Sequence, residues 1–269
     1  MGDPSLSITR HDVAEHFRRR AATYDRSSSW CTDQELGEIV LDLASPTPQD
    51  RVLDVACGTG LVSRLFAGRA AEVVGLDLTE EMAEQAKPYL DRLVLAPAEK
   101  LPFDDGEFDL VVCRQGVQFM DLPDAVEEMV RVVRPGGRVV LINLCAYGPS
   151  DRDAYFEILR LRNPVRRHFF LPDDLANLLS GAGCAPVQAR RYVSVEDVDA
   201  WSDNGAIDED RREAIRAVYR SASPEFRSLH AVREAAGAIV DHMLFVVAAG
   251  TRPPVAKSRN GEESHAAVD

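Results

Sequence analysis

Short apolar runs alternate with helical patterns from residue 51 onward, and this alternation constrains the fold more than any other feature of the sequence. The runs are rich in Val, Leu and Ile, as is typical of parallel strands that are covered on both faces. They occupy residues 51–56, 72–77, 92–96, 108–113 and 138–144, with helical segments at 61–70, 79–90 and 123–134. This order predicts a doubly wound α/β sheet, which binds its ligands at the carboxyl ends of the strands.

Two regions depart from the alternation, and we expect both to cover the strand ends. Residues 9–43 precede the first strand and have a helical pattern, with Thr9 as the expected N-cap. Residues 195–241 are expected to form a helical insertion. Its expected elements are helical stretches at 208–222 and 223–240, and the last strand follows at 243–250. The polar segment from residue 252 onward has no periodicity and is expected to be disordered.

Charge and composition exclude several classes of function. The chain has 44 acidic and 31 basic residues, a formal charge of −13, which disfavours binding to nucleic acid or to anionic membranes. No apolar run approaches the roughly 20 residues that span a bilayer, and MGDPSLSITR lacks the apolar core of a signal peptide. We therefore expect a cytoplasmic protein with no membrane partner.

The five cysteines show neither a CxxC pair nor the spacing of zinc ligands. We expect them to be free and mostly buried, in a reducing compartment. No His and Asp cluster has ligand spacing either, so the sequence predicts no metal site.

A glycine turn follows the first strand, where the run VLDVA breaks into Cys-Gly-Thr-Gly. Gly58 and Gly60 would let a ligand approach closely, but Ser63 replaces the third glycine of a dinucleotide motif and the lysine of a phosphate loop is absent. Asp54 beside the turn suits a cation and disfavours a phosphate. Asp77 ends the second strand 23 residues later, the spacing of a carboxylate that holds ribose hydroxyls. The pattern therefore predicts a ligand that approaches the turn closely, and nothing in it marks a pyrophosphate.

Four segments in this order resemble the class I S-adenosylmethionine-dependent methyltransferases, in particular those that act on small molecules and quinone rings. The segments are VLDVACGTG, VVGLDLTEEM, LAPAEKLPFDDGEFDLVVC and VVRPGGRVV. The resemblance is close over residues 51–144 and loose at Tyr24-Asp25, and it fades after Tyr147. It implies a Rossmann-like sheet of about seven strands, S-adenosylmethionine as the cofactor and S-adenosylhomocysteine as the product. The expected domains are a helical cap (1–43), a methyltransferase domain (44–251) that carries the insertion, and a disordered tail (252–269).

The resemblance also assigns the cofactor site. It implies that Asp54 and the glycine turn hold the methionine part, that Asp77 holds the ribose, and that Ala98-Glu99 lie beside the adenine. Capping of the following helices is the alternative explanation of the two aspartates. Ala56 stands where the family usually has glycine, and a methyl group is often tolerated there. The full expected set is Tyr24, Asp54, Ala56, Gly58, Gly60, Asp77, Leu78, Met82, Ala98, Glu99, Arg114 and Gln115.

The acceptor site is expected to follow the fourth strand, in CRQGVQFMD, where the family brings substrate and methyl group together. Relatives often have a histidine near Gln118, and glutamine cannot act as a base. The catalytic residues are therefore unassigned, with His16, Gln118 and His168 as candidates. The segment RLRNPVRRHFF is either a solvated face or, with Arg162, Arg166 and Arg167, a pocket for an anionic acceptor. The expected substrate residues are Phe17, Gln118, Phe119, Arg166, Arg167 and His168.

The sequence thus favours methyl transfer to a small phenolic, quinone-like or polyketide-like acceptor of secondary metabolism, at oxygen or at carbon. Alignment of the two reactants would supply most of the catalysis. Two alternatives stay open: the same pocket could catalyse a rearrangement or cyclisation without methyl transfer, or the chain could be a non-catalytic subunit of a methyltransferase complex. A homodimer is also left open.

Overall fold

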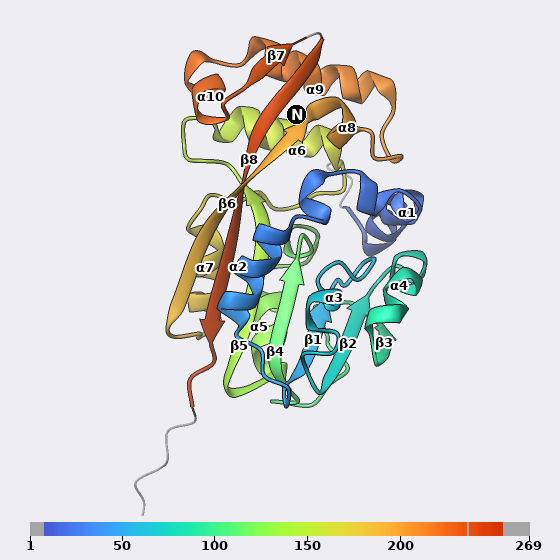
Figure 1. Ribbon diagram of the computed structural model, residues 1–269, viewed down its shortest axis with the longest axis vertical. Helices are drawn as coiled ribbons and strands as arrows, with labels where there is room; N and C mark the ends of the chain where they lie inside the picture. The colour runs from blue at the N-terminus through green and yellow to red at the C-terminus, as the bar shows by residue number, and fades with distance from the viewer. Residues whose placement is uncertain (1–7, 236, 255–269) are drawn as a thin grey trace, which may run out of the picture.

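A twisted mixed sheet forms the centre of the computed structural model, which describes residues 8–235 and 237–254 (Figure 1). Its strands are β1 (Arg51–Val55), β2 (Glu72–Asp77), β3 (Arg92–Leu95), β4 (Phe108–Arg114), β5 (Val133–Cys145), β6 (Val187–Asp197), β7 (Arg233–Ala235) and β8 (Ala238–Thr251). Their order is β3-β2-β1-β4-β5-β8-β6, and β7 pairs with β8. The first five strands run parallel, whereas β8 is antiparallel to both of its long neighbours. The predicted doubly wound α/β sheet is confirmed, with eight strands in the described residues instead of seven.

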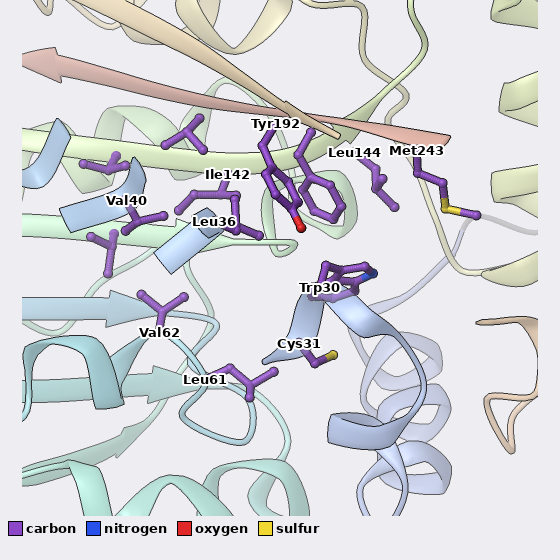
Figure 2. Close-up of a cluster of buried hydrophobic side chains, with 14 of the residues drawn as sticks. Trp30, Cys31, Leu36, Val40, Leu61, Val62, Ile142, Leu144, Tyr192 and Met243 are labelled. Carbon is purple, nitrogen blue, oxygen red and sulfur yellow. The ribbon is translucent and has the colours of Figure 1, made fainter. Parts of the chain in front are cut away.

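Helices cover both faces of this sheet, because successive strand residues point to opposite sides. Val52 of β1 belongs to one buried apolar cluster and the adjacent Leu53 to the other. The first cluster includes residues of α2 (Gln34–Ala44) and α3 (Ser63–Phe66), and Figure 2 shows Leu36 of α2 beside Ile142 of β5. The second includes residues of α5 (Asp124–Val132) and α7 (Asp174–Gly181).

The N-terminal cap begins with α1 (Arg10–Arg20), which lies beside α4 (Glu80–Ala86) near the strand ends (Figure 1). The predicted N-cap is confirmed, since Thr9 Oγ1 accepts from the N–H of Asp12 at 3.2 Å and the Asp12 carboxylate accepts from the N–H of Thr9 at 2.8 Å. Two short 3₁₀ turns, η1 (Tyr24–Arg26) and η2 (Ser29–Cys31), then lead into α2. Two further 3₁₀ turns follow α4 and β4 respectively, η3 (Lys87–Tyr89) and η4 (Val117–Phe119).

A second helical layer lies beyond the end of the parallel strands. There β6 and β8 continue past their neighbours, because β5 pairs with β8 only as far as Leu244 whereas β6 pairs with it to Val240. Around this extension lie α6 (Arg152–Arg162), α8 (Val198–Ser202), α9 (Glu209–Ser221) and α10 (Pro224–Leu229), as Figure 1 shows.

A buried histidine joins three parts of this layer. His230, directly after α10, lies between two carboxylates, with Nδ1 at 2.8 Å from Asp241 of β8 and Nε2 at 2.9 Å from Asp151 before α6. The hydroxyl of Tyr219 in α9 donates to the second oxygen of Asp241 at 2.5 Å. Burial alone would lower the pKa of His230, but the two carboxylates outweigh it and raise this pKa to about 9.

The insertion differs from the sequence prediction at two places. The expected helix over 223–240 is wrong beyond Leu229, because the chain turns there into the strands β7 and β8. Pairing of β7 with the start of β8, and of β8 with β6 from Val240 onward, holds this segment extended against its helical pattern. No local pattern predicted β6, since most residues in its first half are exposed and form no apolar run. Of the tail expected to be disordered, residues 255–269 lie outside the described part.

Candidate active site

A pocket of about 730 Å³ opens at the carboxyl ends of β1, β2 and β4, under the N-terminal cap. Its walls come from the turns after those strands, from the segment after β3, and from α1 and η1. Twelve of the predicted site residues line it: Phe17, Tyr24, Ala56, Gly58, Asp77, Leu78, Met82, Ala98, Glu99, Arg114, Gln115 and Phe119. The fold therefore brings together residues that the sequence spreads over a hundred positions.

Asp77 ties the second strand to the glycine turn after the first. Its Oδ2 accepts from the N–H of Gly58 and its Oδ1 from the N–H of Thr79, both at 2.8 Å. Burial raises the pKa of this carboxyl, although the two backbone donors oppose the shift. Each oxygen keeps a further lone pair, so Asp77 can still accept hydrogen bonds from ligand hydroxyls in the pocket.

Two residues that line the pocket have left-handed backbone conformations without being glycine. Ala56 has φ of 56° and Gln115 has φ of 53°. Such angles bring the Cβ close to the backbone and are found at strained functional turns. Because a Cβ added to Gly116 would lie 2.8 Å from the Cβ of Ala56, the two turns are in close contact.

A smaller cavity of about 270 Å³ lies behind the glycine turn, and both Asp54 and Arg114 line it. Asp54 accepts from Ser63 Oγ at 2.6 Å, and burial raises its pKa to about 7. The Arg114 guanidinium lies 5.1 Å from the Trp30 ring centroid. This cavity therefore offers a carboxyl group and a guanidinium to one ligand.

Gly60 was expected in the same site, but it lines neither of these two cavities. It has φ of 82°, and a Cβ there would lie 2.9 Å from both the Cα of Ala86 and the ring of Tyr89. The absence of a side chain thus serves the packing of the turn against α4 and η3.

The N-terminal cap is tied to the sheet around the pocket. Thr59 Oγ1 donates to Asp25 at 2.5 Å, and Gln85 Nε2 donates to the carbonyl of Ala21 at 2.7 Å. At the opposite end of the pocket, Arg10 forms a salt bridge with Glu99 at 3.3 Å. Arg10 lines the pocket but carries no motif in the sequence, so only its place on α1 identifies it.

A third cavity, of about 280 Å³, adjoins the large pocket and shares four of its residues, namely Phe17, Tyr24, Gln115 and Phe119. It is lined further by Arg20, Trp30, Gln118, Leu144, Arg162, Asn163 and Arg166. We call it the arginine cavity. Four predicted substrate residues line it, namely Phe17, Gln118, Phe119 and Arg166, and it also contains Arg20, which the sequence did not indicate.

Two of the three candidate catalytic residues, His16 and Gln118, are held by other side chains. His16 Nε2 lies 3.2 Å from Asn163 Oδ1, and burial together with the charge of Arg20 lowers its pKa to about 4. Gln118 Nε2 donates to the carbonyl and the Oε1 of Gln115, and Gln118 Oε1 accepts from Asn143 at 2.6 Å. No histidine lines the large pocket or the arginine cavity among the residues described.

Arg167 and His168 were expected beside the substrate, and the structure does not bring them there. Their backbone N–H groups both donate to the carbonyl of Gln118, at 2.9 and 3.1 Å, which fixes this segment against η4. The Arg167 guanidinium pairs with Asp121, and His168 Nε2 lies 3.0 Å from the carbonyl of Met120. His168 lines a separate surface groove. Of the adjacent residues Arg166 and Arg167, only Arg166 lines the arginine cavity.

Other predictions concern the chain as a whole. Within residues 8–235 and 237–254, no helix is long and apolar enough to cross a membrane. The same residues hold no group of three or more His, Cys, Asp and Glu side chains placed to bind a metal ion. All five cysteines are buried and free, as expected.

Comparison with known proteins places these features in context. Residues 53–141 match a methyltransferase domain family. The demethylmenaquinone methyltransferase of Renibacterium salmoninarum is 32% identical over 214 residues, which cover 76% of this chain and 89% of that protein. The malonyl-[acyl-carrier protein] O-methyltransferase of Salmonella typhimurium is 34% identical over 171 residues, 62% of this chain and 66% of that protein. The crystal structure of the YcgJ protein from Bacillus subtilis superposes with a TM-score of 0.75 at 25% identity, covering 82% of this chain and 99% of that one.

Proposed function

Because this chain belongs to the class I S-adenosylmethionine-dependent methyltransferases, we propose that it transfers the methyl group of that cofactor to a small acceptor in the arginine cavity. The large pocket would hold the cofactor, and the neighbouring cavity would hold the acceptor. The observation that carries the proposal is their shared wall, because reacting atoms must meet where the two sites join.

The chemistry of the large pocket fits the cofactor. Asp77 offers lone pairs to ribose hydroxyls, and Leu78, Met82 and Ala98 offer apolar surface to the adenine. The lining holds no phosphate cradle, which agrees with a nucleoside that carries no phosphate. Glu99 is engaged by Arg10 and by the N–H of Asp121, so we assign it to closing the adenine end of the pocket.

The cavity behind the glycine turn fits the methionine part. Arg114 would pair with the carboxylate of the amino acid, and Asp54 would lie near its ammonium group. An ammonium ion would favour the ionised form of Asp54, opposing the burial that raises its pKa. The bound cofactor supplies an electrophilic methyl group on a positive sulfur. The protein residues hold the acceptor in line with it and exclude water.

Aromatic side chains would align the acceptor. Phe17 and Phe119 lie edge to face with ring centroids 5.0 Å apart, and Phe17 and Tyr24 lie 6.3 Å apart. This apolar wall suits a phenolic, quinone-like or polyketide-like ring. A relative named for demethylmenaquinone supports a quinone-like acceptor, and a relative named as an O-methyltransferase supports an oxygen acceptor. Since no described histidine lines either site, we infer that the acceptor ionises without a histidine base.

The test is turnover with cofactor labelled in the methyl group, using fractionated metabolite extracts as the acceptor source. Methyl transfer predicts equal amounts of S-adenosylhomocysteine and of a labelled product whose mass has risen by one methylene unit. A changed metabolite without S-adenosylhomocysteine would instead support a rearrangement or cyclisation in this pocket. Failure of the purified protein to bind S-adenosylhomocysteine at all would overturn the proposal.

A further inference from the structure

Three guanidinium groups from two distant parts of the chain line the arginine cavity. They belong to Arg20 of α1, Arg162 at the end of α6, and Arg166 in the following loop. Their exposed fractions are 2%, 3% and 3%. Arginine is almost never buried to this extent without a negative partner, because moving its charge out of water costs roughly several kcal/mol per ion.

None of the three forms a salt bridge with a carboxylate in the described part of the chain. Nearby arginines on the surface do have such partners: Arg160 pairs with Glu157, and Arg167 pairs with Asp121. The buried arginines therefore differ from their neighbours in lacking a negative partner, although they are the ones whose charge is most costly to bury.

Their hydrogen bonds to neutral groups are incomplete. Arg20 Nη1 donates to Asn163 Oδ1 at 2.9 Å, but its Nε has no partner among the described residues. Arg162 Nε donates to the carbonyl of Trp201 at 2.9 Å, and its Nη2 likewise lacks a partner in the part of the chain described. Donors that are buried and unpaired cost roughly 1–3 kcal/mol each, more when charged.

Arg166 is the third arginine that lines the cavity. Its Nε donates to the carbonyl of His168 at 2.9 Å, and its Nη2 lies 3.4 Å from Asn143 Oδ1. The Phe169 ring lies 5.3 Å from its guanidinium carbon. These contacts hold Arg166 in place while its charge stays uncompensated.

Burial disfavours the charged forms of Arg162 and Arg166, but both guanidinium groups stay protonated at neutral pH. It lowers the pKa of Arg162 to about 9, with a contribution from the charge of Arg20, and it lowers the pKa of Arg166 to about 10. Glu196 opposes the shift of Arg162, but its carboxylate already accepts from the backbone N–H groups of Ser29 and Trp30. At neutral pH the cavity therefore carries positive charge that an anion would compensate.

We propose that the arginine cavity binds an oxyanion, a carboxylate or phosphate group, carried by the methyl acceptor. Guanidinium groups match both anions, because their planar N–H donors can pair with two oxygens at once. The anionic end would lie among Arg20, Arg162 and Arg166, and the rest of the acceptor would extend along Phe17 and Phe119 toward the large pocket. This inference rests on the proposed function, since it names the acceptor class of the same enzyme.

The test uses the full chain saturated with S-adenosylhomocysteine and three probes of similar shape: benzoate, phenyl phosphate and the neutral benzamide. Calorimetry should show that at least one of the two anions binds about tenfold or more tightly than benzamide. The anion that binds more tightly identifies carboxylate or phosphate as the group the cavity accepts. Equal binding of all three probes, or no binding of either anion, would overturn the proposal.

Variants then locate the anion. Arg20→Gln and Arg166→Gln should each weaken binding of the preferred anion about tenfold or more, while the affinity for S-adenosylhomocysteine stays within about twofold of the wild-type value. Arg162→Lys keeps the charge and replaces Arg162→Gln if that variant does not fold. It should weaken binding of the anion, because lysine lacks the planar pair of N–H donors. Arg160→Gln is the matched control, since this arginine lies on the same helix, is 54% exposed and pairs with Glu157. Unchanged anion affinity in the three cavity variants would assign the anion elsewhere.

The two proposals fail in different ways. Loss of the proposed function would appear as an absence of S-adenosylhomocysteine binding in the wild-type protein, before any probe is added. Loss of the inference alone would appear as normal S-adenosylhomocysteine binding with no preference for the anionic probes.

Discussion

The Asp77 carboxylate accepts a hydrogen bond from the backbone N–H of Gly58 at 2.8 Å, which joins the end of β2 to the glycine turn after β1. The same side chain lines the large pocket. One carboxylate thus shapes the turn and faces the ligand, and its removal should affect cofactor binding in both ways.

Asp77→Ala is expected to weaken S-adenosylmethionine and S-adenosylhomocysteine by roughly 1–3 kcal/mol, because ribose hydroxyls and the N–H of Gly58 lose an acceptor. Asp77→Asn keeps one carbonyl acceptor and should lose less. Isothermal calorimetry measures both, with Asp153→Ala as the control because Asp153 is 87% exposed and far along the chain from the pocket. Unchanged affinity in Asp77→Ala would remove the ribose assignment.

The N-terminal cap is expected to close over bound cofactor. Asp25→Ala removes the partner of Thr59 and should raise the cofactor KM, by an amount equivalent to roughly 1 kcal/mol. Hydrogen exchange of residues 10–26 should slow when S-adenosylhomocysteine binds, and it should be faster in Asp25→Ala than in wild type. Asp42→Ala is the control, since Asp42 is 64% exposed and pairs with Arg190. Identical exchange with and without ligand would exclude a closing role for the cap.

Ala56→Gly is expected to stabilise the protein by about 1 kcal/mol, because Ala56 has φ of 56° and glycine adopts this conformation without strain. Ala217→Gly provides the opposite control, since Ala217 is an exposed residue within α9 and glycine there should destabilise by about 1 kcal/mol. Urea unfolding measures both free energies. A destabilised Ala56→Gly would mean that the methyl group contributes more by packing than it costs in strain.

The His230 network predicts how stability depends on pH. The folded pKa of His230 is raised from 6.5 to about 9, so the folded protein holds this proton more tightly than the unfolded chain. Its contribution is therefore complete below about pH 6.5 and is lost as the pH rises through about 9. On the acid side, burial would raise the pKa of Asp151, but His230 and the backbone N–H groups of Tyr147 and Gly148 together outweigh it and lower this pKa, so the Asp151 contribution is lost only at low pH.

His230→Gln is expected to be less stable than the wild type at pH 6. Its free energy of unfolding should also fall much less between pH 6.5 and 9 than that of the wild type. Unfolding by urea at a series of pH values gives this slope directly. His11→Gln is the control, because His11 is exposed on α1. If the wild-type and His230→Gln curves run parallel over this range, the histidine is not the group that titrates.

Local patterns predicted the elements whose residues carry their own signal. The strands β1, β2, β4 and β5 are apolar on both faces, so their runs are visible without any knowledge of their partners. Thr9 caps α1 through a residue three positions away, which is a local interaction as well. The helix expected over 223–240 was wrong in its second half because residues 233–235 pair with 238–240 as a hairpin, and β8 continues from that hairpin into its pairing with the distant strand β6.

The sequence by itself determined the α/β sheet, the glycine turn and the strand-end acids Asp54 and Asp77, because spacing along one strand or turn fixes each of them. Only the tertiary structure decided the contents of the arginine cavity. Arg20 and Arg162 are 142 residues apart and meet through Asn163, whereas Arg167, next to Arg166, points to Asp121 instead. Adjacent arginines look alike in a sequence, and only the packing of α1 against the end of α6 determines which of them are buried and face a ligand.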